Sequence, residues 1–63
     1  MNTREFESIK ALLDESVIKQ LCEMGRIDAI RFFWENVTVG GFRFRLPVIR
    51  DFIDMLRKAE NGH

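Results

Sequence analysis

The chain contains a single cysteine, Cys22, and this limits the ways in which a protein of 63 residues can be stabilised. A domain of this length hides only about 60% of the surface that its unfolded chain exposes, so its core is small. Such domains usually add disulfides, a metal or a second subunit. One cysteine cannot form a disulfide within the chain, and Cys22 with a terminal His63 gives no paired metal ligands. We therefore expect a homodimer.

The charge of the chain is balanced, with ten basic and ten acidic residues. A neutral chain has no strong field to attract nucleic acid or an anionic membrane. The N-terminus lacks the apolar core of a signal peptide, and no run approaches the ~20 apolar residues that cross a bilayer. An unpaired cysteine fits a reducing compartment. These features predict a cytoplasmic protein that does not bind membranes.

The region from Thr3 to Glu35 has the apolar spacing of helices. A first helix is predicted to begin at the N-cap Thr3 and to stop at Gly25, although the run Asp14–Ser16 can cap a later start and split it. The following residues either continue that helix or form another one. Apolar residues recur every three or four positions along the first segment, at Phe6, Ile9, Leu13, Val17, Leu21 and Met24.

Three adjacent aromatic residues, Phe32, Phe33 and Trp34, stand near the end of this helical region. On a helix they fan over about 200°, so they cannot all face one small core. Some of them must meet another chain or lie open.

Residues 37–46 have the pattern of a β-strand, because Phe42 and Phe44 alternate with Arg43 and Arg45. The two adjacent glycines of this segment can form a two-residue hairpin turn. Its arms would be only about three residues long, and even longer isolated hairpins are marginal. We prefer one strand, bulged at the glycines, that pairs with the same strand of a second subunit across a two-fold axis.

A final helix is predicted to begin at Pro47 and to run to Ala59 or Glu60. Its apolar stripe covers more than half of the circumference, so we expect it to pack on two sides, against its own chain and a neighbour. The expected dimer interface combines apolar residues of the helices and the strand: Phe33, Trp34, Phe42, Phe44, Ile49, Phe52, Ile53 and Leu56.

Signatures of catalysis are weak. The sole histidine is the last residue, and nucleophilic chemistry needs a base beside the nucleophile. The glycine pair lacks the GxGxxG or GxxxxGK[ST] context of a phosphate site. Cys22 fits a small core residue better than a reactive thiol. We predict no enzymatic activity, no cofactor and no metal site.

Two kinds of binding fit these features. An apolar cleft between helices is a common receptor for an amphipathic helix of a partner protein. Alternatively, a dimeric strand pair places Arg43 and Arg45 in the major groove of DNA, as in ribbon-type repressors. Those repressors place the strand before two helices, whereas here a long helical region comes first, and this chain is not basic. Nucleic acid is the less favoured partner.

The chain, particularly residues 30–63 (IRFFWENVTVGGFRFRLPVIRDFIDMLRKAENGH), resembles a family of small early proteins of lambda-like temperate bacteriophages. That family is encoded between the exonuclease and excisionase genes. The resemblance spans the full chain and implies a homodimer whose protomer has two helices and one strand. It also implies early expression, promotion of lytic over lysogenic development, no enzymatic activity and no cofactor.

These observations together predict an α+β fold. The expected molecule is a small intertwined homodimer, each protomer a single domain over residues 1–63 with two helices, the first of which can be split, and one central strand. Its expected role is regulation in the cytoplasm of an infected bacterium, by binding a host or phage protein through an apolar cleft. The alternative is a ribbon-type DNA-binding regulator that uses Arg43 and Arg45.

Overall fold

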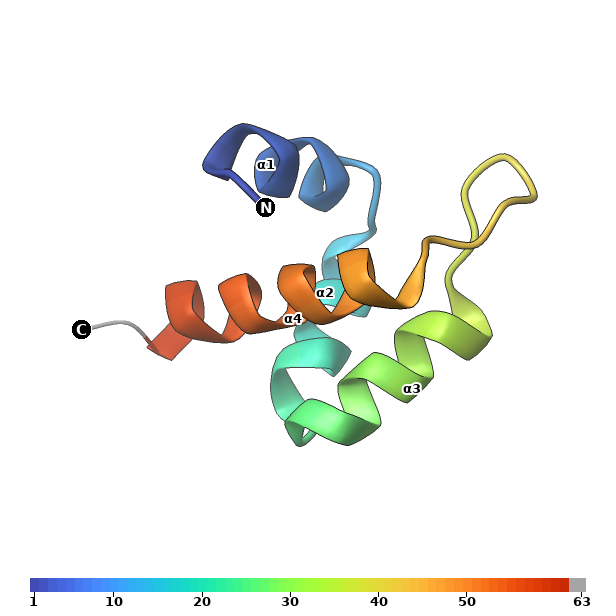
Figure 1. The fold of residues 1–63 in the computed structure, drawn as a ribbon. Helices are drawn as coiled ribbons and strands as arrows, with labels where there is room; N and C mark the ends of the chain where they lie inside the picture. The colour runs from blue at the N-terminus through green and yellow to red at the C-terminus, as the bar shows by residue number, and fades with distance from the viewer. Residues whose placement is uncertain (62–63) are drawn as a thin grey trace.

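The computed structural model describes residues 1–61, which form four α-helices (Figure 1). The terminal His63 lies outside the described residues. This part of the chain contains no β-strand, so the prediction of an α+β fold with a central strand is wrong. The helices are α1 (Thr3–Ala11), α2 (Glu15–Glu23), α3 (Arg26–Asn36) and α4 (Leu46–Asn61).

The N-terminal helical region divides into three short helices. Leu12 ends α1, and its N–H donates to the carbonyl oxygen of Ile9 at 3.0 Å. Asp14 has an extended backbone and begins α2, at the later start that the run Asp14–Ser16 allowed. Gly25 was predicted as a helix stop, and α2 does end just before it, with Met24 as the C-cap residue. Gly25 also has an extended backbone and is the N-cap residue of α3. Each extended residue redirects the chain, so the three helices can pack around a fourth.

The first helix is capped one residue earlier than predicted. The side-chain oxygen Oδ1 of Asn2 accepts a hydrogen bond from the backbone N–H of Glu5 at 2.8 Å. This bond satisfies one of the free N–H groups of the first turn, the role that was expected of Thr3.

The central element is α4, which contacts the other three helices (Figure 1). Its buried face has the spacing i, i+3, i+4, i+7 of one helical stripe and consists of Ile49, Phe52, Ile53 and Leu56, each at most 1% exposed. The broad apolar stripe of this helix was expected to need a neighbouring subunit. In the structure α1, α2 and α3 of the same chain each pack against α4.

An aromatic cluster joins these elements. The ring of Phe52 on α4 lies 5.2 Å from that of Phe6 on α1 and 5.7 Å from that of Phe33 on α3, between centroids. Phe44, from the segment before α4, meets Phe33 edge to face at 5.6 Å. Such pairs each contribute about 0.5–1.5 kcal/mol beyond the area that they bury. The cluster therefore fixes both α1 and the α3–α4 connection onto the core.

The connection between α3 and α4 reverses at Gly40 and Gly41, which have φ angles of 61° and 84°. Positive φ at both central residues is the signature of a type I′ turn. Val39 and Phe42 exchange both backbone hydrogen bonds, at 2.9 and 3.0 Å, and form a single antiparallel bridge. The strand predicted over residues 37–46 is thus replaced by a minimal hairpin. The turn pairs Val39 with Phe42, and backbone pairing within this segment does not extend beyond that one bridge.

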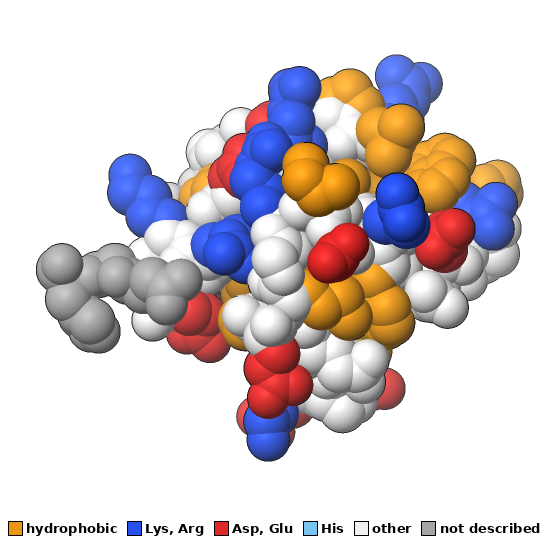
Figure 2. All heavy atoms as spheres, turned by 90° about the horizontal axis from the view of Figure 1, so that it is seen from below, with side chains coloured by type: hydrophobic (Ala, Val, Ile, Leu, Met, Phe, Trp, Pro, Cys, Tyr) orange, Lys and Arg blue, Asp and Glu red, His pale blue; other side chains and the backbone are white. Residues whose placement is uncertain are grey.

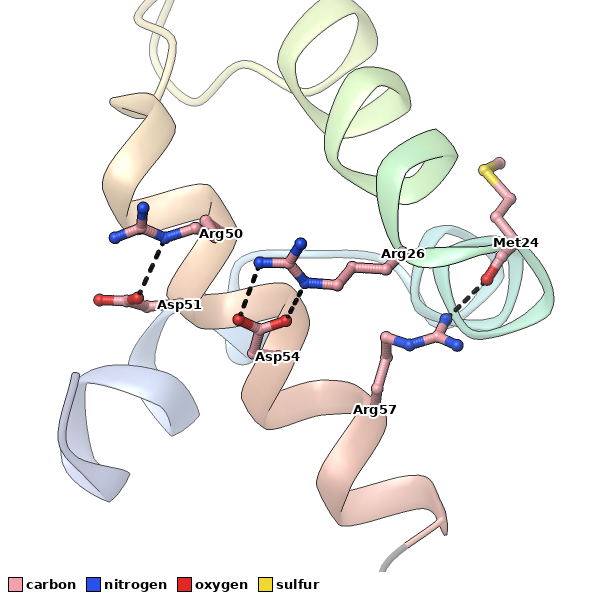
Figure 3. A network of polar contacts seen from close by, with 6 residues as sticks. All are labelled: Met24, Arg26, Arg50, Asp51, Asp54 and Arg57. Carbon is pink, nitrogen blue, oxygen red and sulfur yellow. Dashed lines mark hydrogen bonds and ion pairs between the residues drawn. The ribbon is translucent and has the colours of Figure 1, made fainter.

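Two arginines tie α4 to the corner between α2 and α3 (Figure 3). Arg26 donates from Nε and Nη2 to the two carboxylate oxygens of Asp54, at 2.6 and 3.2 Å. Arg57 donates from Nη1 to the carbonyl oxygen of Met24, the C-cap residue of α2, at 2.7 Å. These hydrogen bonds therefore attach the short link between α2 and α3 to α4.

Candidate functional site

Five of the residues expected at a dimer interface lie inside one chain. Phe33, Ile49, Phe52, Ile53 and Leu56 are each at most 1% exposed. They already have apolar partners in the core of the single chain that the structure contains. The homodimer itself stays a prediction.

The other three expected interface residues are placed differently. Phe44 is half-buried against Phe33, whereas Trp34 is 37% exposed and Phe42 is 78% exposed. Of the three adjacent aromatics on α3, Phe33 enters the core, Phe32 is half-buried and Trp34 is exposed.

A surface that we call the Trp34 surface contains four large apolar side chains that the core leaves uncovered. Ile27 and Trp34 are seven residues apart on α3 and share one face of that helix, about two turns from each other. Figure 2 looks at the molecule from the side of α3 and shows several patches of hydrophobic side chains on this face, with both basic and acidic side chains between them. The Trp34 surface consists of Ile27, Trp34, Phe42 and Leu46, which are 64%, 37%, 78% and 50% exposed.

Arg43 lies against this surface. Its Nε donates to the carbonyl oxygen of Trp34 at 3.0 Å, and its guanidinium carbon lies 5.6 Å from the centroid of the Trp34 ring. Arg45 is exposed and forms no side-chain hydrogen bond or ion pair within residues 1–61. The two arginines do not flank a strand pair, which the ribbon-type DNA-binding alternative requires.

A depression of about 530 Å³ lies elsewhere, between α1, α2 and the end of α4. Its lining combines five charged side chains with three apolar ones, so it differs from the expected apolar cleft. The lining residues are Lys10, Leu13, Glu15, Ile18, Lys19, Cys22, Glu23 and Glu60.

Cys22 is half-buried in this depression, with its Sγ 3.9 Å from Oε1 of Glu60. Burial raises the pKa of the Cys22 thiol, and the nearby Glu60 carboxylate raises it further. Because the thiolate is the nucleophile, a raised pKa makes this cysteine less reactive at neutral pH.

Residues 1–61 contain no group of three or more histidine, cysteine, aspartate or glutamate side chains that could hold a metal ion. None of the helices in the same range has the length and apolar character needed to span a bilayer. The exposed apolar side chains of the Trp34 surface are therefore the most distinctive feature for a function.

Two members of the Trp34 surface were not expected from the sequence. Ile27 has helical spacing with Ile30 and Phe33, which suggests a core position. Leu46 stands at the end of the predicted strand, but it is the first residue of α4. The sequence signal for an exposed Ile27 was the number of apolar residues on α3. A helix that packs on one side only leaves some of its apolar side chains exposed to solvent.

The chain matches no known family model, no curated protein and no solved structure. The resemblance to early phage proteins stays a prediction, and the geometry of the described residues carries the argument on function.

Proposed function

We propose that the protein is a non-enzymatic binding module whose Trp34 surface contacts another protein. The observation that carries this proposal is the exposure of Ile27, Trp34, Phe42 and Leu46 in a chain that has its own buried core. Ile27 and Trp34 share one face of α3, and Arg43, next to Phe42 in the chain, contacts Trp34. Exposed apolar side chains that adjoin one another mark interaction sites, whereas single ones such as Leu12 are ordinary.

The residue types of the Trp34 surface support recognition of a protein. Aromatic and arginine side chains are enriched among the residues that dominate protein interfaces. Trp34 and Phe42 provide such aromatic groups, and Arg43 is already stacked on Trp34.

The strength of such a contact depends on the apolar area that it can bury. The exposed parts of the four side chains equal roughly two complete side chains, whose burial contributes on the order of 5 kcal/mol. Association itself costs about 4–15 kcal/mol. Apolar contact alone therefore gives weak binding, and a stable complex needs polar or charged contacts at the edge of the surface.

The resemblance to early phage proteins supplies the biological setting of the proposal. In that setting the module is a homodimer in the cytoplasm of an infected bacterium, and it promotes lytic development by binding a host or phage protein. Sedimentation over a range of protein concentrations tests the homodimer, because the fraction of dimer rises with concentration.

The proposed contact is tested in a phage that carries the gene. The double variant Ile27→Ser and Phe42→Ser removes two exposed apolar groups, and Leu12→Ser is the matched control because Leu12 is also 58% exposed but lies at the end of α1. We expect the double variant to raise the frequency of lysogeny to that of a gene deletion, and the control to match the parent. Circular dichroism verifies that both variants keep their helices.

A double variant that folds and leaves the frequency of lysogeny unchanged contradicts the proposal. A control variant that changes lysogeny as strongly as the double variant also contradicts it, because the effect would then not be specific to the Trp34 surface.

A further inference from the structure

The segment of residues 36–50, which includes the hairpin and the start of α4, carries three arginines and no acidic residue. Residues 29–50 contain four arginines and a single acidic residue, Glu35, although the whole chain has ten residues of each sign. The remaining residues consequently hold six basic and nine acidic side chains. A protein that is neutral overall therefore has one basic end, which includes the hairpin and the start of α4.

The arginines are placed next to the exposed apolar groups. Arg31 lies between Ile27 and Trp34 on α3, four residues after the first and three before the second, so the three share a helical face. Arg50 follows Leu46 by four residues and lies one turn along α4. Each of these two helices thus presents an arginine beside an exposed apolar side chain.

Ion pairs among the described residues neutralise little of this positive charge. Among residues 1–61, Arg31, Arg43 and Arg45 form no ion pair. Arg50 has one long contact, 3.8 Å between its Nε and Oδ1 of the adjacent Asp51. All four arginines are exposed. Their guanidinium groups are available to carboxylates of a bound partner.

We propose that the Trp34 surface binds an acidic amphipathic helix of another protein. This inference rests on the proposed function and adds the chemistry of the partner. The apolar side chains of that helix, at the spacing i, i+3, i+4, i+7, cover Trp34, Phe42 and Ile27. Its carboxylates pair with Arg31, Arg45 and the outer edge of Arg43.

A nucleic acid fits this surface less well. Aromatic and arginine side chains can stack on the bases of a single strand, but one side of Trp34 is occupied by Arg43. Ile27 and Leu46 have no π-face for a base.

The experiment selects ligands without assuming their sequence. Random peptides of about 16 residues, long enough for about four helical turns, are displayed and selected on the full-length protein. Enriched peptides are labelled with fluorescein, and their binding is measured by anisotropy at several salt concentrations. Labelled single-stranded DNA and RNA of random sequence are measured beside them.

We expect the enriched peptides to carry a net negative charge and apolar residues at helical spacing. Their affinity should fall as salt rises, because exposed charges are screened. The variants Arg45→Glu and Phe42→Ser should each raise the Kd for the peptides about tenfold. Lys19→Glu makes the same charge change on α2, outside the Trp34 surface, and should leave binding unchanged.

Several results overturn the inference. These are a failure to enrich any peptide, enrichment of neutral or basic peptides, or binding that Arg45→Glu leaves intact. Tighter binding of the labelled nucleic acids also overturns it, as does a homodimer that Phe42→Ser converts to monomers. If the phage variants still change lysogeny in such a case, only the acidic partner is wrong and the proposed function survives.

Discussion

Arg43 donates a hydrogen bond from Nε to the backbone carbonyl oxygen of Trp34 and lies over the indole ring of the same residue. Trp34 is in the last turn of α3, where carbonyl groups have no helical donor. A side chain that was expected to face solvent or DNA therefore satisfies the end of a helix. It also attaches the hairpin to α3.

Replacing Arg43 with alanine should loosen the hairpin and uncover the indole. Trp34 is the only tryptophan, so its fluorescence reports this site directly. For Arg43→Ala we expect red-shifted emission, stronger quenching by acrylamide and a free energy of unfolding lower by about 1 kcal/mol. Arg45→Ala is the matched control, and unchanged quenching in Arg43→Ala contradicts the contact.

The hairpin turn should distinguish between two substitutions of Gly40. A Cβ at this position meets nothing within 4 Å, so any cost arises from its positive φ of 61°. Gly40→Val should lower the free energy of unfolding by about 1–2 kcal/mol, because β-branched residues disfavour this conformation. Gly40→Asn should be almost neutral, since asparagine is common in type I′ turns. Denaturation by urea measures both values, and equal values contradict the turn.

Local patterns predicted the buried faces of the helices well. Phe6, Ile9 and Leu21 were placed on one apolar stripe, and all three are buried in the core. The final helix was expected to begin at Pro47 and begins at Leu46. These features depend on residues close together in the chain, where helical spacing and proline give direct signals.

The breaks between the first three helices were harder to predict. Asp14 makes no side-chain cap hydrogen bond, and Gly25 does not use a positive φ. Burial of Leu21 and Ala29 against α4 decides where the chain bends, and this depends on long-range packing. With these breaks α1, α2 and α3 all contact α4, whose broad apolar stripe was one reason for expecting a second subunit.

The strand predicted over residues 37–46 was wrong for a related reason. Alternation of Phe42, Arg43, Phe44 and Arg45 has the period of a strand, but the pattern does not reveal whether a pairing strand exists. In the structure Phe44 packs on Phe33 and Phe42 is exposed. Contact with α3, across eleven residues of sequence, replaces the ladder that the alternation suggests.

Two phenylalanines that were both expected at the dimer interface should respond oppositely to substitution. Phe52 is completely buried between two other rings, whereas Phe42 is 78% exposed. Phe52→Ala should cost about 3–5 kcal/mol, close to the entire stability of roughly 3–9 kcal/mol for a domain of this length. We therefore expect Phe52→Ala to be largely unfolded, and Phe52→Leu to fold with a loss of about 1–2 kcal/mol.

Phe42→Ala should change the free energy of unfolding by less than about 0.5 kcal/mol. Urea denaturation followed by circular dichroism compares it with Phe52→Leu at several protein concentrations. If Phe42→Ala is the more damaging substitution, Phe42 is buried in a subunit interface and its exposed placement is wrong.

The pair of Arg26 and Asp54 should make stability depend on pH. Hydrogen bonds from Arg26 lower the pKa of the Asp54 carboxyl. Partial burial of the carboxyl opposes this effect, and the positive charge of Arg26 adds to it. The folded state therefore holds this proton less tightly than the unfolded chain, whose aspartates titrate near about pH 3.9. The stability that the pair provides is complete above that pH and is lost as the pH falls through the lowered folded-state pKa.

Replacement of Asp54 with asparagine should accordingly lower Tm at neutral pH by a small amount. The side chains of Arg26 and Asp54 are 44% and 46% exposed, so solvent screens the pair and added salt weakens it further. The difference in Tm between Asp54→Asn and the parent should shrink as the pH falls below about 3.9, because the carboxyl becomes protonated as the pH passes through its lowered folded-state pKa. Asp28→Asn, which removes a carboxylate of α3 that has no ion pair within residues 1–61, is the control. A Tm difference for Asp54→Asn that stays constant into the acidic range contradicts a stabilising role for the ionised pair.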